Sequence, residues 1–576
     1  MTYREEYERW LKEELLTEEE RQELLSIQND ETEIESRFFA PLSFGTAGLR
    51  GVLGAGINRM NIHTVRQATQ GIANLIRGIG KEACERGVAI CMDCRNMSDV
   101  FAREAACVLA GNHIKAYLFD ALRPTPELSF AIRTIRCIAG INITASHNPK
   151  EYNGYKAYWE DGAQLPPAQA DIVARAIDET DIFHGITRMD YDKALKKGWI
   201  TLIGEEVDES FLFHVQEMAI NRQAVAQAAD TFKVVYTPVH GTGYRLVPEA
   251  LTRLGLKHIL CVPEQMVLDG NFPTVKSPNP ENKEGFALAI ELARKENVDL
   301  IIGTDPDADR VGVIVRNREG EYVPVSGNQM GVLLLDYIIR ARRATGTMPE
   351  SPAALKTIVT TEMVRKVGSE NGVAVFDTFT GFKFMAEKIK QFEEEKSYQY
   401  LLAFEESYGY LMGDYCRDKD AVTASMMIAE MAADYHNAGM TLFDAMQALY
   451  RRYGFYEERT VNLVMPGVDG LSRMAELMES LRNQPPKAIA GTQVARIRDY
   501  SSGKIKNLQN SSMEKMELSG SNVLYFELQD GTSFIIRPSG TEPKIKVYIL
   551  AQGADAAECS ERAERYQAAA LELKDR

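Results

Sequence analysis

Three long stretches of this chain repeat one order of predicted elements: strand, helix, strand, helix, strand. In each stretch, short apolar runs alternate with longer amphipathic segments. The strands are predicted at residues 88–93, 115–120 and 138–143, then 233–239, 258–262 and 299–302, then 357–360, 373–377 and 400–403. The helices are predicted at 101–111, 124–136, 244–254, 284–296, 331–343, 362–369 and 382–394. This alternation is typical of βαβ units, and it predicts three mixed α/β domains with largely parallel sheets.

Each repeat ends in the same way, because its third apolar strand leads into a polar motif. Ser146 follows the first such strand, Asp305 the second and Glu405 the third. Ligands of open α/β sheets bind at the carboxyl ends of the strands. We therefore expect three related domains whose active edges face a common cleft.

The two ends of the chain follow other patterns. Tyr7, Trp10, Leu11 and Leu15 recur at helical spacing near the N-terminus. After about residue 460, strands follow one another with turns such as Gln529-Asp-Gly531, before a C-terminal amphipathic helix at 554–573. That order predicts an antiparallel sheet in a smaller α+β domain. The expected division is a helical extension (1–40), three α/β domains (41–204, 205–325 and 326–458) and the α+β domain (459–576).

Size and composition restrict the kind of protein this can be. At 576 residues the chain is too long for a single core, and its 45% hydrophobic and 26% charged residues are ordinary for a globular protein. A formal net charge of −16 argues against nucleic-acid binding, although a local island of Arg and Lys could still bind a small anion. We find no long apolar run and no secretory signal, and we expect a cytoplasmic monomer or small homo-oligomer without membrane partners.

The motif Thr144-Ala-Ser-His-Asn-Pro lies where a buried strand ends and the backbone turns outward. Ser146 has His147 beside it and Lys156 ten residues on, which suits a nucleophile with proton-handling groups at hand. Ordinary turn chemistry is the alternative for a serine at this place. Arg50, in a glycine-rich loop, could hold phosphate or could be a surface residue after a turn.

The motif Gly303-Thr-Asp-Pro-Asp-Ala-Asp-Arg310 places three aspartates at alternate positions. In extended backbone Asp305, Asp307 and Asp309 would converge on one side, and three carboxylates repel one another unless a cation lies among them. Oxygen-only ligands favour Mg²⁺ or Ca²⁺. Arg310 stands where an EF-hand loop needs glycine, so that type of site is excluded, whereas a solvated acidic turn remains the alternative. Arg310 also suits a phosphate that bridges metal and guanidinium.

The last motif, Arg537-Pro-Ser-Gly-Thr-Glu-Pro-Lys-Ile-Lys546, combines a guanidinium, two hydroxyls, a glycine and two lysines. That combination supplies charge and directed donors for a phosphate, although a turn before a strand would look similar. Glu405 and Ser407 add acceptors that suit sugar hydroxyls, and Lys383 could add a donor near them.

Three other features are discounted. His240-Gly-Thr-Gly243 lacks the third glycine of a dinucleotide-binding loop. Cys91 and Cys94 have no second pair with which to complete a zinc site. The methionines at 426–431 are expected in a core.

Taken together, the four motifs resemble those of the α-D-phosphohexomutase superfamily, in the same order and over nearly the whole chain. Phe404-Glu-Glu-Ser-Tyr-Gly409 and Arg417-Asp-Lys-Asp-Ala421 are most similar to the longer phosphoglucomutases, a branch that also includes phosphopentomutases.

The resemblance implies that Ser146 carries a phosphoryl group and, with Asp305, Asp307 and Asp309, holds Mg²⁺. The phosphoryl group would pass to a sugar monophosphate, giving glucose 1,6-bisphosphate, which turns over and returns its other phosphate to Ser146. Lys156 would be the general acid/base, with His147 and Arg50 in support. Glu405 and Ser407 would read the sugar hydroxyls. The distal phosphate would be bound by Arg537, Ser539, Gly540 and Thr541.

The expected activity is the interconversion of glucose 1-phosphate and glucose 6-phosphate. Phe404 and Tyr408 depart from the pattern of shorter relatives in the sugar-reading loop, so phosphopentomutase and phosphomannomutase activities remain alternatives. Two alternative functions from other protein classes are a Mg²⁺-dependent sugar phosphatase and a non-catalytic sugar-phosphate sensor.

Overall fold

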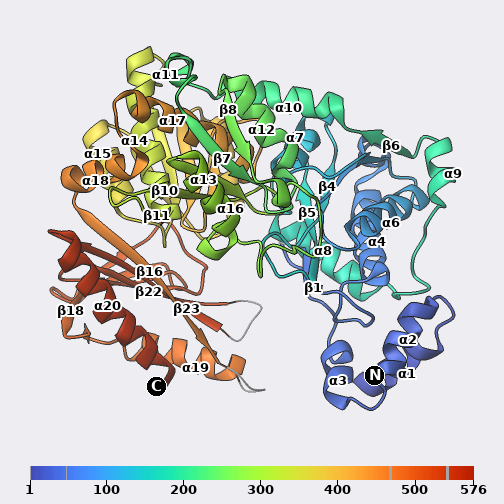
Figure 1. Cartoon of the computed structure of the whole chain (residues 1–576). Helices are drawn as coiled ribbons and strands as arrows, with labels where there is room; N and C mark the ends of the chain where they lie inside the picture. Colours follow the sequence, from blue (N-terminus) through green and yellow to red (C-terminus); the bar gives the residue numbers. More distant parts are fainter. Residues whose placement is uncertain (1, 47, 466–469, 540–543, 576) are drawn as a thin grey trace. The chain divides into compact units, whose positions relative to one another are not determined.

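The computed structural model describes residues 2–46, 48–465, 470–539 and 544–575 (Figure 1). The chain divides into two compact units. Unit 1 comprises Met1–Ser326 and Tyr408–Thr441, and unit 2 comprises Gly327–Ser407 and Leu442–Arg576. Among the described residues, none of the helices combines the length and the apolar character needed to cross a membrane.

The first sheet of unit 1 has the strand order β1-β5-β4-β2-β3-β6. Strands β4, β2, β3 and β6 are parallel, whereas β5 and β1 join antiparallel at one edge, so the sheet is mixed. Its strands are β1 (Leu49–Val52), β2 (Val88–Met92), β3 (Ala116–Phe119), β4 (Ala139–Ile143), β5 (Tyr152–Trp159) and β6 (Ile200–Ile203).

Helices cover both faces of this sheet, because alternate residues of a strand point to opposite faces. Val88 and Ile90 of β2 pack into one cluster, with side chains from α4, α6 and α8. Ala89 and Cys91 pack into another cluster on α7. The helices of this part are α4 (Ile62–Ile79), α5 (Lys81–Arg86), α6 (Ser98–Gly111), α7 (Thr125–Ile135), α8 (Pro167–Asp178) and α9 (Tyr191–Lys196).

The second sheet of unit 1 has the order β11-β10-β9-β7-β8. Strands β9, β7 and β8 are parallel, and β10 and β11 add antiparallel. The strands are β7 (Lys233–Thr237), β8 (His258–Cys261), β9 (Leu300–Thr304), β10 (Val311–Arg316) and β11 (Tyr322–Val325), with β15 (Gly409–Leu411) also in this unit. The helices are α10 (Glu205–Glu217), α11 (Arg222–Ala228), α12 (Gly243–Leu254), α13 (Ala287–Glu296) and α17 (Ala421–Asn437). The methionines of α17 are buried, as the sequence predicted.

Unit 2 begins with the third α/β sheet, in which β13, β12 and β14 are parallel. The strands are β12 (Pro352–Thr357), β13 (Ala374–Thr378) and β14 (Gln399–Glu405), and the helices are α14 (Gly327–Thr345), α15 (Met363–Asn371), α16 (Phe382–Glu395) and α18 (Leu442–Tyr453). The strand predicted at 357–360 was wrong by most of its length, since the chain turns after Thr357. Ala353, Ala354 and Leu355 have little intrinsic strand preference, but they are fully buried between two neighbouring strands.

The second sheet of unit 2 is antiparallel, and its main path runs β16-β23-β22-β21-β18-β19-β20. Its strands are β16 (Phe455–Val464), β17 (Ala488–Ile489), β18 (Thr492–Asp499), β19 (Lys504–Asn507), β20 (Met513–Lys515), β21 (Leu524–Leu528), β22 (Ser533–Pro538) and β23 (Lys544–Gly553). Helices α19 (Gly470–Asn483) and α20 (Ala556–Glu572) pack into its core. The predicted turn at Gln529-Asp-Gly531 joins β21 to β22, with Gly531 at a φ of 86°. The predicted fold class, three α/β sheets followed by an α+β domain, is therefore confirmed; the proposed domain limits stay a prediction.

The N-terminal extension folds into α1 (Tyr3–Lys12), α2 (Glu18–Ser26) and α3 (Glu31–Phe38). Its core forms around Trp10, which is fully buried. The Trp10 ring makes edge contacts with Phe38, His63 and Phe183 at centroid distances of 5.7, 5.6 and 4.9 Å. Leu15 does not join this core, because it lies beyond the end of α1 and is 52% exposed.

Replacing Trp10 by alanine should lower the free energy of unfolding of this part by about 3–5 kcal/mol, because it leaves a cavity among aromatic rings. Urea unfolding followed by circular dichroism measures this. Leu15→Ala is the matched control, and its effect should stay within about 0.5 kcal/mol. Equal losses in the two variants would contradict the packing described here.

Candidate active site

Ser146 lies just beyond the carboxyl end of β4, in a backbone conformation that few residues other than glycine adopt. Its φ is 51°, and the residue is 3% exposed. The hydroxyl donates a hydrogen bond to Asp305 Oδ2 at 2.8 Å and lies 3.2 Å from His147 Nδ1. Such rare backbone conformations cluster at functional sites, where the surrounding structure holds them in place.

The loop that carries Ser146 is held by two residues that the sequence reasoning missed. Arg95 is buried and donates to the carbonyls of Ser146, Asn148, Pro149 and Tyr152. Asp93 accepts the Thr144 hydroxyl at 2.6 Å, and Thr144 Oγ1 accepts the backbone N–H of Ser146 at 2.8 Å. The available signal was their position directly after β2, the strand that pairs with β4.

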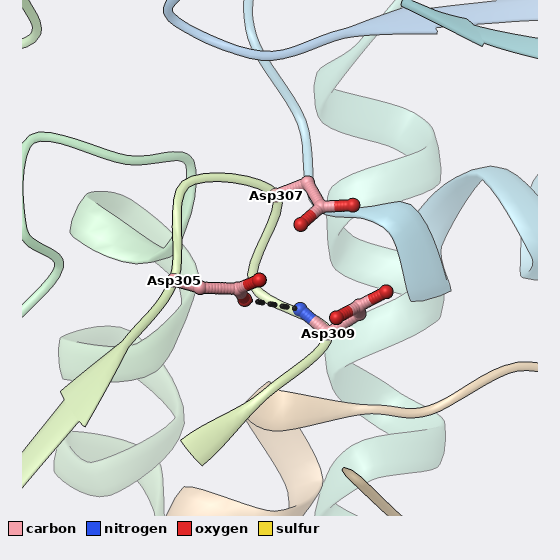
Figure 2. Close-up of side chains that lie close together, drawn as sticks. All are labelled: Asp305, Asp307 and Asp309. Atoms are coloured by element: carbon pink, nitrogen blue, oxygen red, sulfur yellow. Dashed lines mark hydrogen bonds between the residues drawn. The ribbon is translucent and has the colours of Figure 1, made fainter. Parts of the chain in front are cut away.

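Asp305, Asp307 and Asp309 converge as predicted, and Figure 2 shows their carboxylates turned toward one common space. One oxygen from each lies within 4.8 Å of the others. The predicted reason was wrong, however, because the backbone here is a turn rather than an extended strand. Ala308 has a φ of 50°, and Asp305 Oδ1 accepts the backbone N–H groups of Asp309 and Arg310 at 3.1 and 3.0 Å.

The three carboxylates differ in their electrostatic surroundings. Burial, together with repulsion from Asp307 and Asp309, raises the pKa of Asp305 well above its usual range. Burial would also raise the pKa of Asp307, but Lys156 outweighs it and lowers this pKa. Burial and the charge of Asp307 would also raise the pKa of Asp309. Lys419 and Lys156 outweigh them, so this pKa is lowered.

Two lysines partly offset the negative charge of the acidic cluster. Lys156 Nζ lies 2.7 Å from Asp307 Oδ2 and 3.3 Å from Asp309 Oδ2. Lys419 Nζ lies 3.2 Å from Asp309 Oδ2 and 3.2 Å from Asp418 Oδ1. Lys419 lies in the motif Arg417-Asp-Lys-Asp-Ala421, but no local signal in the sequence gives this lysine a role. Only the fold brings it beside the aspartates.

The cluster has the donor set that a hard divalent cation needs. All three aspartates are buried and offer only oxygen, which suits Mg²⁺ or Ca²⁺. Asp307 Oδ1 and Asp309 Oδ1 are buried and receive no hydrogen bond from any residue that the structure describes. Arg310 Nε lies 3.9 Å from Asp309 Oδ1, which is too far for a hydrogen bond. A buried acceptor that receives no hydrogen bond is costly. A bound cation would satisfy both oxygens, so these residues could hold a metal ion.

The other predicted residues of unit 1 lie around this cluster. Arg50 is on β1, and its Nη1 donates to Asn148 Oδ1 in the serine loop at 3.0 Å. Burial, with Arg310 and Arg50 close by, keeps the pKa of His147 well below its usual range, so its imidazole is neutral at pH 7. Arg310 Nη1 lies 3.0 Å from Glu281 Oε1.

The predicted sugar-reading residues lie in unit 2. Glu405 Oε1 accepts the backbone N–H of Gly381 at 2.8 Å, which places this carboxylate at the start of α16. Lys383, on the first turn of α16, has its ammonium 4.9 Å from the Phe384 ring centroid, and burial lowers its pKa. Ser407 is the last residue of the segment Gly327–Ser407, which belongs to unit 2.

Phe404, one of the two departures in the sugar-reading loop, faces the core of unit 2. It is fully buried, and a Cβ added at Gly331 of α14 would lie 2.1 Å from its ring. Phe404 therefore fills the space that Gly331 leaves free on α14. Tyr408, the second departure, has a φ of 68° and belongs to unit 1, where its carbonyl accepts the N–H of Val311.

The predicted phosphate-binding residues that the structure describes lie along β22 and β23. Arg537 stands directly opposite Lys546, and its Nη1 lies 3.5 Å from the Tyr548 hydroxyl. Like charges directly opposite in a sheet are destabilising, a cost that a bound anion would offset. The backbone N–H of Ser539 donates to the Lys544 carbonyl at 2.8 Å. Gly540 and Thr541 lie outside the described residues.

Comparison with known proteins identifies the family of this chain. Residues 41–182, 209–320 and 326–453 match the three alpha/beta/alpha domains of phosphoglucomutase/phosphomannomutase, and residues 481–568 match the C-terminal domain. The chain belongs to the phosphoglucomutase/phosphomannomutase family. It is therefore an enzyme of the phosphohexomutase class, an isomerase, and the superfamily indicated by its motifs is confirmed.

Named relatives agree with this assignment. The chain is 36% identical to a phosphoglucomutase of Staphylococcus aureus strain N315 over 525 residues, which cover 90% of this chain and 91% of the relative. It is 37% identical to a phosphoglucomutase of Staphylococcus saprophyticus over 521 residues, or 90% of this chain and 92% of the relative.

Solved structures of family members share the fold. Parafusin from Paramecium, a phosphoglucomutase solved in an open form, matches with a TM-score of 0.68 at 18% identity over 93% of this chain and 95% of its own. A phosphoglucomutase/phosphomannomutase family protein from Burkholderia thailandensis matches with a TM-score of 0.66 at 16% identity, over 93% of this chain and 97% of its own. At these identities the likeness concerns the fold alone.

Replacing Lys156 by methionine should destabilise unit 1 by about 3–5 kcal/mol in metal-free buffer, because it leaves buried carboxylates without their partner. Urea unfolding in EDTA measures this. The double variant Lys156→Met with Asp307→Asn should recover much of the loss, since it removes one of the carboxylates.

Lys257→Met is the matched control. Lys257 pairs with Asp230, but the two side chains are 59% and 82% exposed. This control should change the free energy of unfolding by less than about 1 kcal/mol. A Lys156→Met variant no less stable than the control would contradict the role of Lys156 in charge balance.

Proposed function

We propose that this family member interconverts α-D-glucose 1-phosphate and glucose 6-phosphate through a phosphoserine at Ser146 and a glucose 1,6-bisphosphate intermediate. The observation that carries the proposal is the 2.8 Å contact between Ser146 Oγ and Asp305 Oδ2, which puts a strand-end hydroxyl against three converging carboxylates. Phosphoryl transfer depends mainly on positioning and charge neutralisation. The names of the staphylococcal relatives favour glucose as the sugar.

We infer that Mg²⁺ is held by Asp305, Asp307, Asp309 and the group on Ser146. Asp307 Oδ1 and Asp309 Oδ1 support this, since they are buried acceptors without a hydrogen-bond donor among the described residues. When bound there, the ion neutralises the charge of the phosphoryl group that is transferred. Arg310 and Arg50 add guanidinium groups that suit phosphate oxygens.

Two groups are placed to handle the protons. When the phosphoryl group returns from glucose 1,6-bisphosphate to Ser146, Ser146 Oγ loses a proton and the sugar oxygen gains one. Transfer in the opposite direction reverses both proton movements. The neutral imidazole of His147, with Nδ1 at 3.2 Å, is placed to exchange a proton with Ser146 Oγ. We assign the transfer of the proton on the sugar oxygen to Lys156. Although burial opposes it, Asp307 and Asp309 raise the pKa of Lys156, so it starts as the charged proton donor.

We assign substrate recognition to residues of unit 2. Glu405, Ser407 and Lys383 would bind the sugar hydroxyls. Arg537 and Ser539, with Gly540 and Thr541, would bind the phosphate that is not transferred. Opposing cations at Arg537 and Lys546 support an anion there. Binding the distal phosphate supplies remote binding energy, which can hold the sugar in place and limit hydrolysis of the phosphoserine.

Ser146→Ala should abolish both phosphorylation and turnover. Incubation with glucose 1,6-bisphosphate should add the mass of one phosphoryl group to the wild type, as measured by intact mass spectrometry, and nothing to the variant. Turnover should fall by a factor on the order of 10³ or more, since the variant loses the nucleophile. Ser502→Ala, at an exposed position, is the control and should gain the phosphoryl group normally. A phosphorylated Ser146→Ala protein would refute the assignment.

Substrate choice can be tested by comparing turnover of glucose 1-phosphate with that of ribose 1-phosphate and mannose 1-phosphate. We expect the highest kcat/KM for glucose 1-phosphate, with trace glucose 1,6-bisphosphate stimulating isomerisation without release of inorganic phosphate. Negligible activity on glucose 1-phosphate would rule out the proposed substrate. Stoichiometric phosphate release would indicate a phosphatase instead.

A further inference from the structure

Asp307 is attached to the first sheet of unit 1 through a residue outside the predicted motifs. Thr125 is the first residue of α7 and is fully buried. Its backbone N–H donates to the Asp307 carbonyl at 2.8 Å, and its hydroxyl donates to Asp307 Oδ2 at 2.7 Å. One threonine therefore holds both the main chain and the side chain of this aspartate.

Asn142 fixes the direction of the Thr125 hydroxyl. Asn142 is fully buried on β4, four residues before Ser146, and its Nδ2 donates to Thr125 Oγ1 at 2.8 Å. Because the amide NH₂ occupies an acceptor position of the hydroxyl oxygen, the hydroxyl hydrogen is free to point at Asp307. Hydrogen bonds in such a chain also polarise one another.

The hydrogen bonds from Asn142 through Thr125 to Asp307 determine which oxygen of Asp307 is left for a cation. Oδ2 receives the Thr125 hydroxyl at 2.7 Å and the Lys156 ammonium at 2.7 Å. Oδ1 is buried and receives no hydrogen bond from the described part of the chain. Two donors from different elements therefore hold Oδ2, and Oδ1 is the oxygen of Asp307 that is left without a hydrogen-bond donor among the described residues.

We propose that Thr125 and Asn142 are positioning residues that orient Asp307 for the cation and tie the strand carrying Ser146 to the loop carrying the aspartates. This inference rests on the proposed cation site. Residues that hydrogen-bond to a metal ligand commonly change metal affinity or activity 10- to 100-fold when they are substituted. Thr125 and Asn142 differ from the catalytic groups because neither is proposed to touch the substrate.

The test is the affinity of the purified full-length chain for Mn²⁺, which like Mg²⁺ prefers oxygen ligands, measured by electron paramagnetic resonance of the free ion. Thr125→Val keeps the shape and the backbone N–H but removes the hydroxyl. We expect its Kd for Mn²⁺ to rise about 10- to 100-fold. Thr125→Ser, which restores a hydroxyl, should regain most of the affinity. Asn142→Leu should weaken binding in the same direction.

Thr69→Val is the matched control for losing a buried hydroxyl. Thr69 is fully buried, and its Oγ1 bonds to the Val65 carbonyl and the Tyr155 hydroxyl, away from the aspartates. Its Kd for Mn²⁺ should equal that of the wild type. A merely structural role for Thr125 would lower the thermal midpoint as Thr69→Val does and leave the Kd unchanged.

The outcomes separate the two proposals. Wild-type binding of Mn²⁺ with an unchanged Kd in Thr125→Val and Asn142→Leu would overturn the positioning role alone. A wild type that binds Mn²⁺ no better than an Asp309→Asn variant would overturn the cation site itself. If Thr125→Val fails to fold, Thr125→Ser and Asn142→Leu decide the question. An unchanged Kd in Asn142→Leu would contradict the role of the hydrogen bonds that run from Asn142 through Thr125 to Asp307.

Discussion

The site depends on repulsion among three buried carboxylates and on the groups that counter it. Two unit charges at the 4.8 Å limit that joins Asp305, Asp307 and Asp309 repel by about 3 kcal/mol at an effective dielectric constant of about 20. Lys156 and Lys419 reduce that cost from two directions, yet the pKa of Asp305 stays raised. The fold therefore keeps a concentration of negative charge that is only partly balanced, which is a suitable condition for a divalent cation.

Rigid strands and unusual loop conformations together bring the hydroxyl to this charge. Ser146 follows β4 and Ala308 follows β9, and both adopt a positive φ. These conformations turn the chain sharply enough for side chains of two sheets to meet at 2.8 Å. Arg95 and Asp93 stabilise the serine loop, and Thr125 holds the aspartate loop, so the strained segments are fixed by buried hydrogen bonds.

Much of the fold could be predicted because its signals are local. Apolar runs and amphipathic spacing located most strands and helices, and the turn at Gln529-Asp-Gly531 indicated a hairpin. Local signals failed where burial outweighed residue preference, as in β12, whose alanines form a strand between two others. They also failed for Leu15, since helical spacing does not reveal where a helix ends.

The sequence by itself determined the motifs that carry the chemistry: a serine, an aspartate cluster and cationic residues, each following an apolar strand. A motif is a set of neighbours in the chain, so it can be read without the fold. Tertiary structure alone decided which distant groups complete it. Lys419 lies 110 positions from Asp309 in the printed numbering, and Thr125 lies 182 positions from Asp307. Charge balance and hydrogen bonding depend on distances in space, and no local pattern encodes those distances.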